Sequence, residues 1–223
     1  MNKITRLLTV GAALLLIVPA ASADWADNFD SYALNSGLIG QGGWDGWEGA
    51  AAADAFVTDI QAYTAPHSLA AIPTTDIVQV FTETSGQWIM TAYMYIPTGS
   101  TGNQFFIMLN SYWPNTNDWS IQVELNADAG TVTDTMASVV GTMIYDAWVQ
   151  IRVEIDLDLN LYDLYYNDVY LSSFAWQSTG VNEIAALDIF SDGGSTIFWD
   201  DCDLMEVLAL EHTTWGNIKT LMQ

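Results

Sequence analysis

The chain has 223 residues, of which 27 are Asp or Glu and only 4 are Lys or Arg, so its formal net charge is −23 at pH 7. Such a surface repels polyanions, so nucleic acid, anionic lipid and uronate-rich or sulfated glycans are poor ligands unless a cation bridges them. The single cysteine, Cys202, cannot form an internal disulfide, so stability must come from packing and from any bound metal.

Residues 1–23 have the pattern of a secretory signal peptide. Lys3 and Arg6 supply the charged start, residues 7–18 the apolar middle, and residues 21–23 the small side chains of a cleavage site. The apolar run is short for a membrane span, and no later stretch is a candidate. We therefore expect an exported protein (secreted, periplasmic or at the cell surface) without a transmembrane segment. A retained N-terminal anchor is the alternative.

Residues 24–207 are predicted to form one all-β domain, because short apolar segments alternate with turn signals and no long helix or internal repeat is evident. A glycine-dense stretch, residues 37–48, is predicted to be a surface loop. Its Trp44 and Trp47 are either exposed, where they could stack on sugar, or buried beneath the loop. The predicted strands are residues 55–58, 68–72, 77–82, 88–96, 104–112, 119–125, 131–136, 139–144, 148–158, 183–190 and 196–206.

The strongest pattern lies between Trp148 and Tyr170. Apolar residues from Val149 to Leu157 alternate with polar ones from Gln150 to Asp158, which is typical of a strand with one buried face. A second aromatic strand follows. It closes on Asn167-Asp168, a dipeptide that suits a two-residue hairpin turn with positive φ.

Residues 208–223 form a tail of different character. A short segment, residues 213–222, could form one or two helical turns with its apolar side chains on one side. We interpret it either as a frayed end or as a docking or sorting signal.

These segments resemble the concanavalin A-like (laminin G-like) jelly rolls. Residues 148–156 match a strand pattern W-x-x-I-x-V-x-I-D, and residues 162–167 match Y-x-L-Y-x-N. Residues 27–32 resemble the first strand of that superfamily, and residues 197–204 its last strand. The resemblance implies an antiparallel two-sheet jelly-roll sandwich, and it supports a fold more strongly than a function.

The resemblance also implies carbohydrate binding on the face of one sheet. Alternation along residues 88–96, 104–112 and 119–125 separates apolar from polar positions; Phe105, Ile107 and Leu109, for example, are assigned to the apolar side. If these strands lie beside residues 148–158, tyrosines, amides and carboxylates share one surface, a mixture suited to a neutral polysaccharide or glycan. A plain polar sheet face is the alternative. The predicted ligand-binding residues are Tyr93, Tyr95, Asn110, Tyr112, Gln122, Glu124, Arg152 and Glu154.

A catalytic alternative comes from Glu154, Asp156 and Asp158. Family 16 glycoside hydrolases share this fold, and their Glu-x-Asp-x-Glu motif resembles this run. The chain departs at Asp158, which is a methylene shorter than Glu, and Arg152 can pair with Glu154. We therefore favour a secreted, non-catalytic, lectin-like protein. A structural or adhesive surface protein, suggested by the tail and the acidity, is a third possibility, and the sequence leaves the oligomeric state open.

Calcium is a further implication of the resemblance. Several jelly-roll glycanases hold a structural Ca²⁺ between the first strand and an Asp of the last, and Asp27 or Asp30 with Asp200 resembles that arrangement. The alternative is that Asp200 accepts hydrogen bonds from backbone amides.

Overall fold

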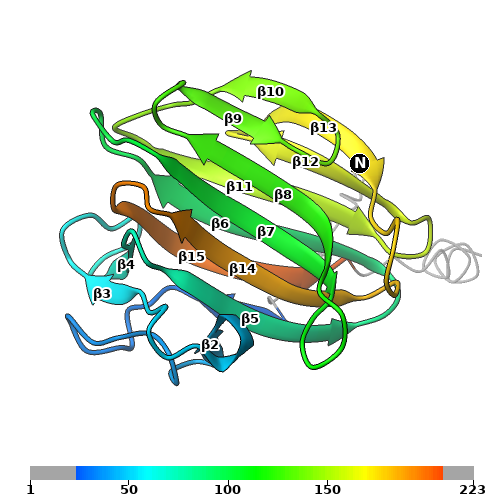
Figure 1. Ribbon diagram of the computed structural model, residues 1–223, viewed down its shortest axis with the longest axis horizontal. Coiled ribbons are helices and arrows are strands. Elements are labelled where there is room, and N and C mark those ends of the chain that lie inside the picture. The colour runs from blue at the N-terminus through cyan, green and yellow to red at the C-terminus, as the bar shows by residue number, and fades with distance from the viewer. Residues whose placement is uncertain (1–23, 208–223) are drawn as a thin grey trace, which may run out of the picture.

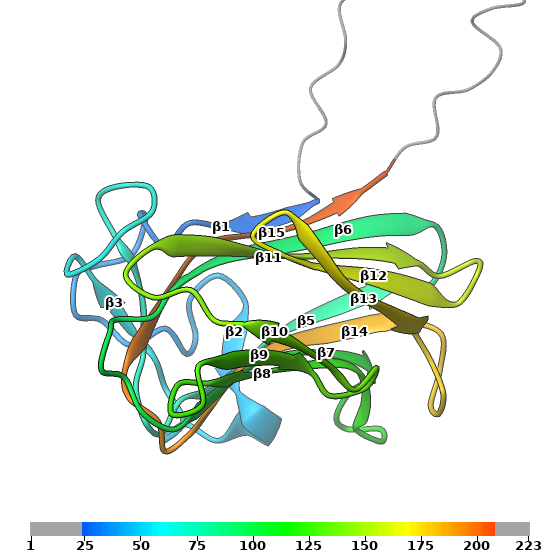
Figure 2. The ribbon, with the colours of Figure 1, turned by 90° about the horizontal axis from the view of Figure 1, so that it is seen from above.

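A computed structural model describes residues 24–207 of the chain. The predicted signal peptide and C-terminal tail lie outside these residues. Two antiparallel sheets pack face to face as a jelly-roll sandwich (Figures 1 and 2), as predicted. None of the helical structure in residues 24–207 has the length and apolar character that crossing a membrane requires.

We call the two layers sheet A and sheet B. Sheet A has the order β13-β12-β11-β6-β15-β4-β3, and β1 also pairs with β15. Its strands are β1 (Trp25–Asp27), β3 (Phe56–Thr58), β4 (Ser68–Ala71), β6 (Gln87–Tyr95), β11 (Trp148–Asp156), β12 (Leu161–Tyr166), β13 (Val169–Ala175) and β15 (Ile197–Glu206). Sheet B has the order β10-β9-β8-β7-β14-β5-β2. Its strands are β2 (Trp44–Gly46), β5 (Asp76–Glu83), β7 (Asn103–Ser111), β8 (Asp118–Asn126), β9 (Thr131–Asp134), β10 (Val139–Thr142) and β14 (Ile184–Asp192).

The predicted alternation of β11 is confirmed. Every second side chain from Val149 to Leu157 is at most 2% exposed and faces sheet B, while the residues between them are partly exposed. The apolar face of β6, from Trp88 to Met94, packs into the same core. The hairpin turn after β12 is also confirmed, since Asn167 and Asp168 have φ values of 51° and 60°.

Three local predictions are wrong. The first strand, β1, ends at Asp27, because the chain then turns through Phe29, whose φ is 59°. The glycine-dense stretch is not all loop, since Trp44 begins the short edge strand β2, which pairs with β5. In β7 the faces are reversed: Phe106 and Met108 enter the core between the sheets, while Ile107 and its alternate neighbours form a separate apolar cluster.

A buried carboxylate links the two sheets. Asp134 of β9 is fully buried and accepts hydrogen bonds from the Tyr162 hydroxyl of β12 (2.8 Å) and the Ser172 hydroxyl of β13 (2.6 Å). The backbone N–H groups of Met136 and Ala137 also donate to it. These donors replace the water that the carboxylate loses on folding, so the polar group is tolerated inside the sandwich.

We expect Tyr162→Phe to lower the free energy of unfolding by about 1 to 3 kcal/mol, because it removes the hydroxyl that donates a hydrogen bond to the buried carboxylate. Urea unfolding measures the change. Tyr165→Phe is the matched control, since Tyr165 lies on the solvent side of the same strand. Equal stability of the two variants would contradict a structural role for the Asp134 link.

Candidate ligand-binding site

The predicted ligand-binding residues do not form one surface, because the strands that carry them belong to different sheets. The prediction assumed that β6, β7, β8 and β11 are neighbours, whereas β6 and β11 lie in sheet A and β7 and β8 in sheet B. Tyr93, Tyr95, Arg152 and Glu154 are on the outer face of sheet A, and Gln122 and Glu124 on that of sheet B.

The two remaining residues of the predicted set lie on opposite sides of sheet B. Asn110 is 1% exposed and points inward, where its amide donates to the carbonyls of Thr179 (2.5 Å) and Val181 (2.8 Å). Its amide nitrogen is therefore occupied in the structure. Tyr112 follows β7 and packs edge-on against Trp47, at the rim of the outer face.

The outer face of sheet A is held by contacts among its own side chains. Tyr63 and Tyr93 stack with ring centroids 3.8 Å apart, and the Gln150 amide donates to the Tyr93 hydroxyl. The Arg152 guanidinium lies 3.8 Å above the Tyr165 ring and forms an ion pair with Glu154. A hollow of about 520 Å³ beside Tyr93 is lined by further polar groups of β1, β6 and β15.

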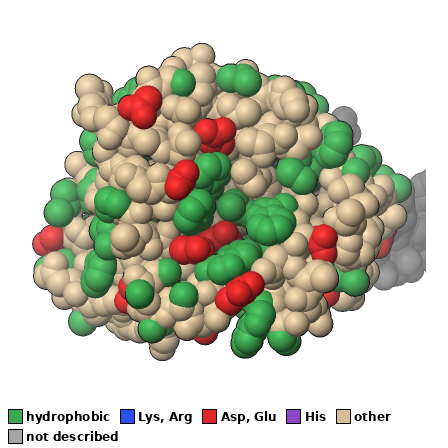
Figure 3. Space-filling view, in the orientation of Figure 1, with side chains coloured by type: hydrophobic (Ala, Val, Ile, Leu, Met, Phe, Trp, Pro, Cys, Tyr) green, Lys and Arg blue, Asp and Glu red, His purple; other side chains and the backbone are tan. Residues whose placement is uncertain are grey.

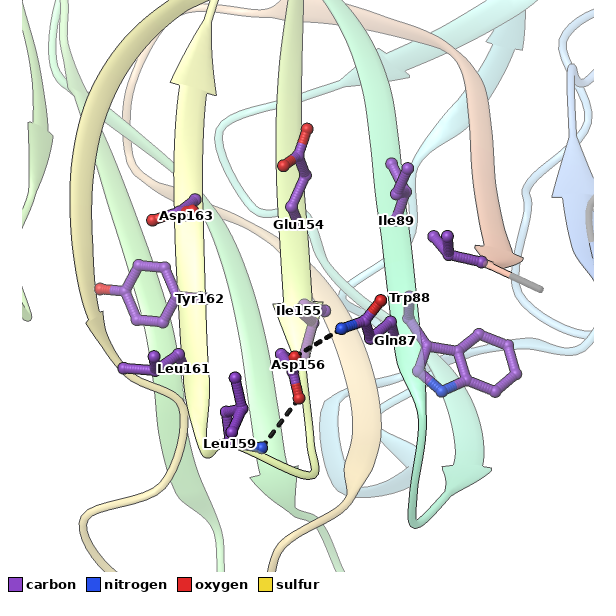
Figure 4. Close-up of a pocket in the computed structure, with 11 residues that line it drawn as sticks. Gln87, Trp88, Ile89, Glu154, Ile155, Asp156, Leu159, Leu161, Tyr162 and Asp163 are labelled. Atoms are coloured by element: carbon purple, nitrogen blue, oxygen red, sulfur yellow. Dashed lines mark hydrogen bonds between the residues drawn. The ribbon is translucent and has the colours of Figure 1, made fainter. Parts of the chain in front are cut away.

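The carboxylates of the catalytic alternative do not lie together on one strand. Glu154 and Asp156 share the outer face of β11 beside a hollow of about 380 Å³ (Figure 4), but β11 ends at Asp156. Asp156 accepts hydrogen bonds from the Gln87 amide (2.7 Å) and the Leu159 N–H (2.8 Å). Asp158 lies in the following turn and accepts from the Gly86 N–H at 3.2 Å. Each carboxylate therefore has a partner within the protein.

The three residues predicted to bind calcium also have protein partners. Asp27 accepts from the Tyr32 hydroxyl (2.6 Å), the Trp44 indole (2.9 Å) and a backbone N–H. Asp30 accepts from the amide of Asn28 and from a backbone N–H.

Asp200 accepts three backbone N–H groups, which is the alternative that the sequence left open. Burial nevertheless raises the pKa of Asp200 to about 7. No group of three or more metal-binding side chains occurs within residues 24–207. Calcium binding by Asp27, Asp30 and Asp200 stays a prediction of the sequence.

The outer face of sheet B carries a hollow of about 470 Å³. Apolar and acidic side chains gather there (Figure 3), over β14, β7 and β8. We call it the sheet B hollow. It is lined by Trp47, Asp76, Phe105, Ile107, Asn117, Trp119, Gln122, Asp188 and Phe190.

Aromatic rings form two walls of the sheet B hollow. Trp47 and Trp119 stack with centroids 6.1 Å apart, and Phe105 and Phe190 stack at 5.5 Å. Trp119 is 37% exposed, because a register shift between β7 and β8 turns it outward, although alternation alone had placed it with the buried Ile121. Of the two tryptophans predicted to be exposed or buried, Trp44 is buried and Trp47 partly exposed.

Two carboxyl groups lie between these walls, and the sequence interpretation missed both. Asp76 begins β5, and Asp188 is in the middle of β14, where it is 3% exposed. Burial raises the pKa of Asp188 well above its ordinary value, and the charge of Asp76 raises it further. A signal was present: Asp188 is the one charged residue in the run Ile184–Phe190, and a carboxylate in such a strand needs a reason.

No protein-family model matches the sequence, and no curated protein does either. Solved structures do match. A sialidase shares 10% identity with a TM-score of 0.52, over 86% of this chain and 19% of its own. The cellulose-induced protein Cip1 shares 12% identity with a TM-score of 0.50, over 82% of this chain and 97% of its own.

A third match is the CBM22-1 xylan-binding domain from Paenibacillus barcinonensis Xyn10C. It shares 12% identity with a TM-score of 0.49, over 86% of this chain and 99% of its own. At such identities the similarity shows the fold alone. The fold is an antiparallel two-sheet jelly-roll sandwich, as the sequence predicted.

We expect Glu154→Gln to lower the free energy of unfolding by less than about 1 kcal/mol, because the Glu154 side chain is 40% exposed and solvent screens its ion pair with Arg152. Urea unfolding with and without 1 M NaCl measures the free energy of unfolding of both proteins. Salt should reduce the difference in this free energy between wild type and variant. A loss of several kcal/mol would show that Glu154 has a structural role beyond this pair.

Proposed function

We propose that this protein is an exported, non-catalytic, lectin-like jelly roll that binds a neutral glycan in the sheet B hollow. The observation that carries the proposal is the pair of aromatic walls beside an amide and two carboxyl groups that line the same hollow. The sheet B hollow combines partly exposed rings (Trp47, Trp119) with an amide (Gln122) and two carboxyl groups.

This combination suits carbohydrate for a physical reason. The flat faces of Trp and Phe rings cover the apolar C–H faces of a pyranose, while amide and carboxyl groups exchange hydrogen bonds with its hydroxyls. A cavity of about 470 Å³ is within the size range of small-ligand sites, and one or two sugar rings fill such a volume.

The charge of the chain restricts the ligand further. Arg152 is the only Lys or Arg between residues 24 and 207, and it lies on the other sheet. A uronate or sulfated sugar in the sheet B hollow would meet two aspartates and no cation within the described residues. The proposed ligand is therefore uncharged.

The proposal places the ligand on sheet B, so the two faces can be tested against each other. We expect Trp119→Ala to weaken binding at least tenfold, because it removes a stacking wall, while Tyr95→Ala on sheet A leaves affinity within about twofold. Affinity electrophoresis of the full chain in gels containing barley β-glucan, arabinoxylan or galactomannan measures both.

Loss of binding only in Tyr95→Ala would move the site to the sheet A residues Tyr93, Tyr95, Arg152 and Glu154. A folded wild-type protein retarded by none of these polysaccharides, nor by any glycan on an array, would refute the proposal. Release of reducing ends from β-glucan would instead favour the glycanase alternative, and Glu154→Gln would test whether the carboxylates of β11 take part.

A further inference from the structure

The two aspartates of the sheet B hollow are in contact with each other. Asp188 is opposite Val78 and Asp76 opposite Phe190 in the β5–β14 pairing, so the two side chains are diagonal neighbours on the outer face. Their carboxyl groups lie within hydrogen-bonding reach of each other. A hydrogen bond between them needs a proton on one carboxyl, because two carboxylates can only accept.

Within residues 24–207, no cation lies beside this pair. Glu48 of η1 (Trp47–Gly49) and Tyr112 face it, and the charge of Glu48 raises the pKa of Asp76. On β2 the exposed Asp45 accepts a hydrogen bond from the next N–H. Strands β7 and β4, which also contact β14, carry no titratable side chain. Every charged group of the described residues that faces the pair is therefore acidic. The charged groups at the far ends of the two strands, Glu83 and Asp192, are acidic as well.

Each of the two aspartates has an oxygen without a protein donor. Among the described residues, no donor group reaches the buried Oδ1 atoms of Asp76 and Asp188, and Asp188, which lines the hollow, is 97% buried. Buried polar atoms in folded proteins nearly always have a partner. These two oxygens therefore need a proton shared between the two carboxyls, a donor from outside the chain, or both.

We propose that Asp76 and Asp188 share one proton and form the polar recognition centre of the sheet B hollow, so that glycan is bound when the proton is present and released when it leaves. This inference rests on the proposed function. The half-protonated pair keeps its one O–H in the bond between the two carboxyls and carries a single negative charge, so its remaining lone pairs can accept hydrogen bonds from the hydroxyls of a neutral sugar.

The fully ionised pair differs in both respects. It has no proton for the bond between the carboxyls, and it places two negative charges beside each other in a site that has no cation within the described residues. Water must then enter to solvate the charges, and a sugar has to displace that water. Burial favours the proton on Asp188, since burial raises its pKa most and Asp76 is the more exposed of the two.

The same proton affects stability without any ligand. Both carboxyl groups have a raised pKa in the folded protein, so their contribution to stability is complete below the pKa values of the unfolded chain. This contribution to stability is lost as pH rises through the pKa values of the two carboxyl groups in the folded protein. Asp188→Asn removes this dependence, because the Asn amide donates to Asp76 at every pH as the protonated Asp188 does.

The test compares the full-length wild type, Asp188→Asn and Asp188→Ala between pH 4 and pH 9, with barley β-glucan, arabinoxylan and galactomannan as probes. We expect wild-type affinity to fall at least tenfold across this range. Asp188→Asn should bind within about threefold of the best wild-type affinity at every pH, and Asp188→Ala should bind weakly throughout. Asp163→Asn, which removes a carboxylate from sheet A, should keep the wild-type profile.

Thermal unfolding over the same pH series, without ligand, separates the two hypotheses. We expect the Tm of wild type to fall relative to Asp188→Asn as pH rises. Parallel Tm curves would overturn the shared proton even if a glycan binds. If no probe binds but the curves diverge, the proposed function fails while the proton-sharing pair stands. A rise in wild-type Tm with CaCl₂ at pH 7.5 that is absent in Asp188→Asn would show that a cation, and not a proton, holds the pair.

Discussion

The structure depends on stabilising buried carboxylates by hydrogen bonds in place of cations. Between residues 24 and 207 the chain has a single Lys or Arg, so an aspartate that enters the sandwich cannot be paired with one. Asp27, Asp134 and Asp200 instead accept hydrogen bonds from hydroxyl, indole and backbone N–H donors. These bonds replace hydration without the large desolvation cost of bringing a second charge inside. The hydrogen-bonded aspartates therefore also fix the loops and sheets that supply their donors.

These hydrogen bonds also fix the positions of several loops. Asp27 draws Tyr32 and Trp44 to the first turn, which fixes the start of β2 beneath it. Asp200 in the last strand draws the backbone of Tyr63 and Thr64, which are more than 130 residues earlier in the chain. Each contact joins segments that are distant in sequence, so the acids contribute to topology as well as to solubility.

The sequence allowed the strands to be predicted far better than their partners. Alternation identifies β6 and β11 because each has one apolar and one polar face, and the Asn167-Asp168 turn follows from the φ values that these residues tolerate. It fails for β7, whose central residues are apolar on both faces, so a period of two carries no information about which side is inside. It cannot assign strands to sheets either, since β6 pairs with β11 and β15 across long stretches of chain.

The ligand site was missed for the same reasons. The sheet B hollow joins Trp47, Trp119 and Asp188 from η1, β8 and β14, and only the sheet order brings them together. Trp119 depends in addition on a register shift that no alternation shows. Only Asp188 was recognisable in the sequence, as an acid inside an apolar strand. It indicates a binding site only once the structure places Asp76 beside it.

The two outer faces differ in whether their polar groups are satisfied. On sheet A the guanidinium of Arg152 has both a carboxylate and a ring, and the acids beside it accept from neighbouring side chains or backbone. On sheet B the deepest acid, Asp188, has an oxygen that accepts no hydrogen bond from any donor group of the described residues. The protein satisfies its other buried carboxylates with its own hydrogen-bond donors. The missing donor at this one therefore indicates that another group supplies the hydrogen bond. The sheet B hollow is thus the place where the proposed glycan would complete the hydrogen bonding of a buried acid.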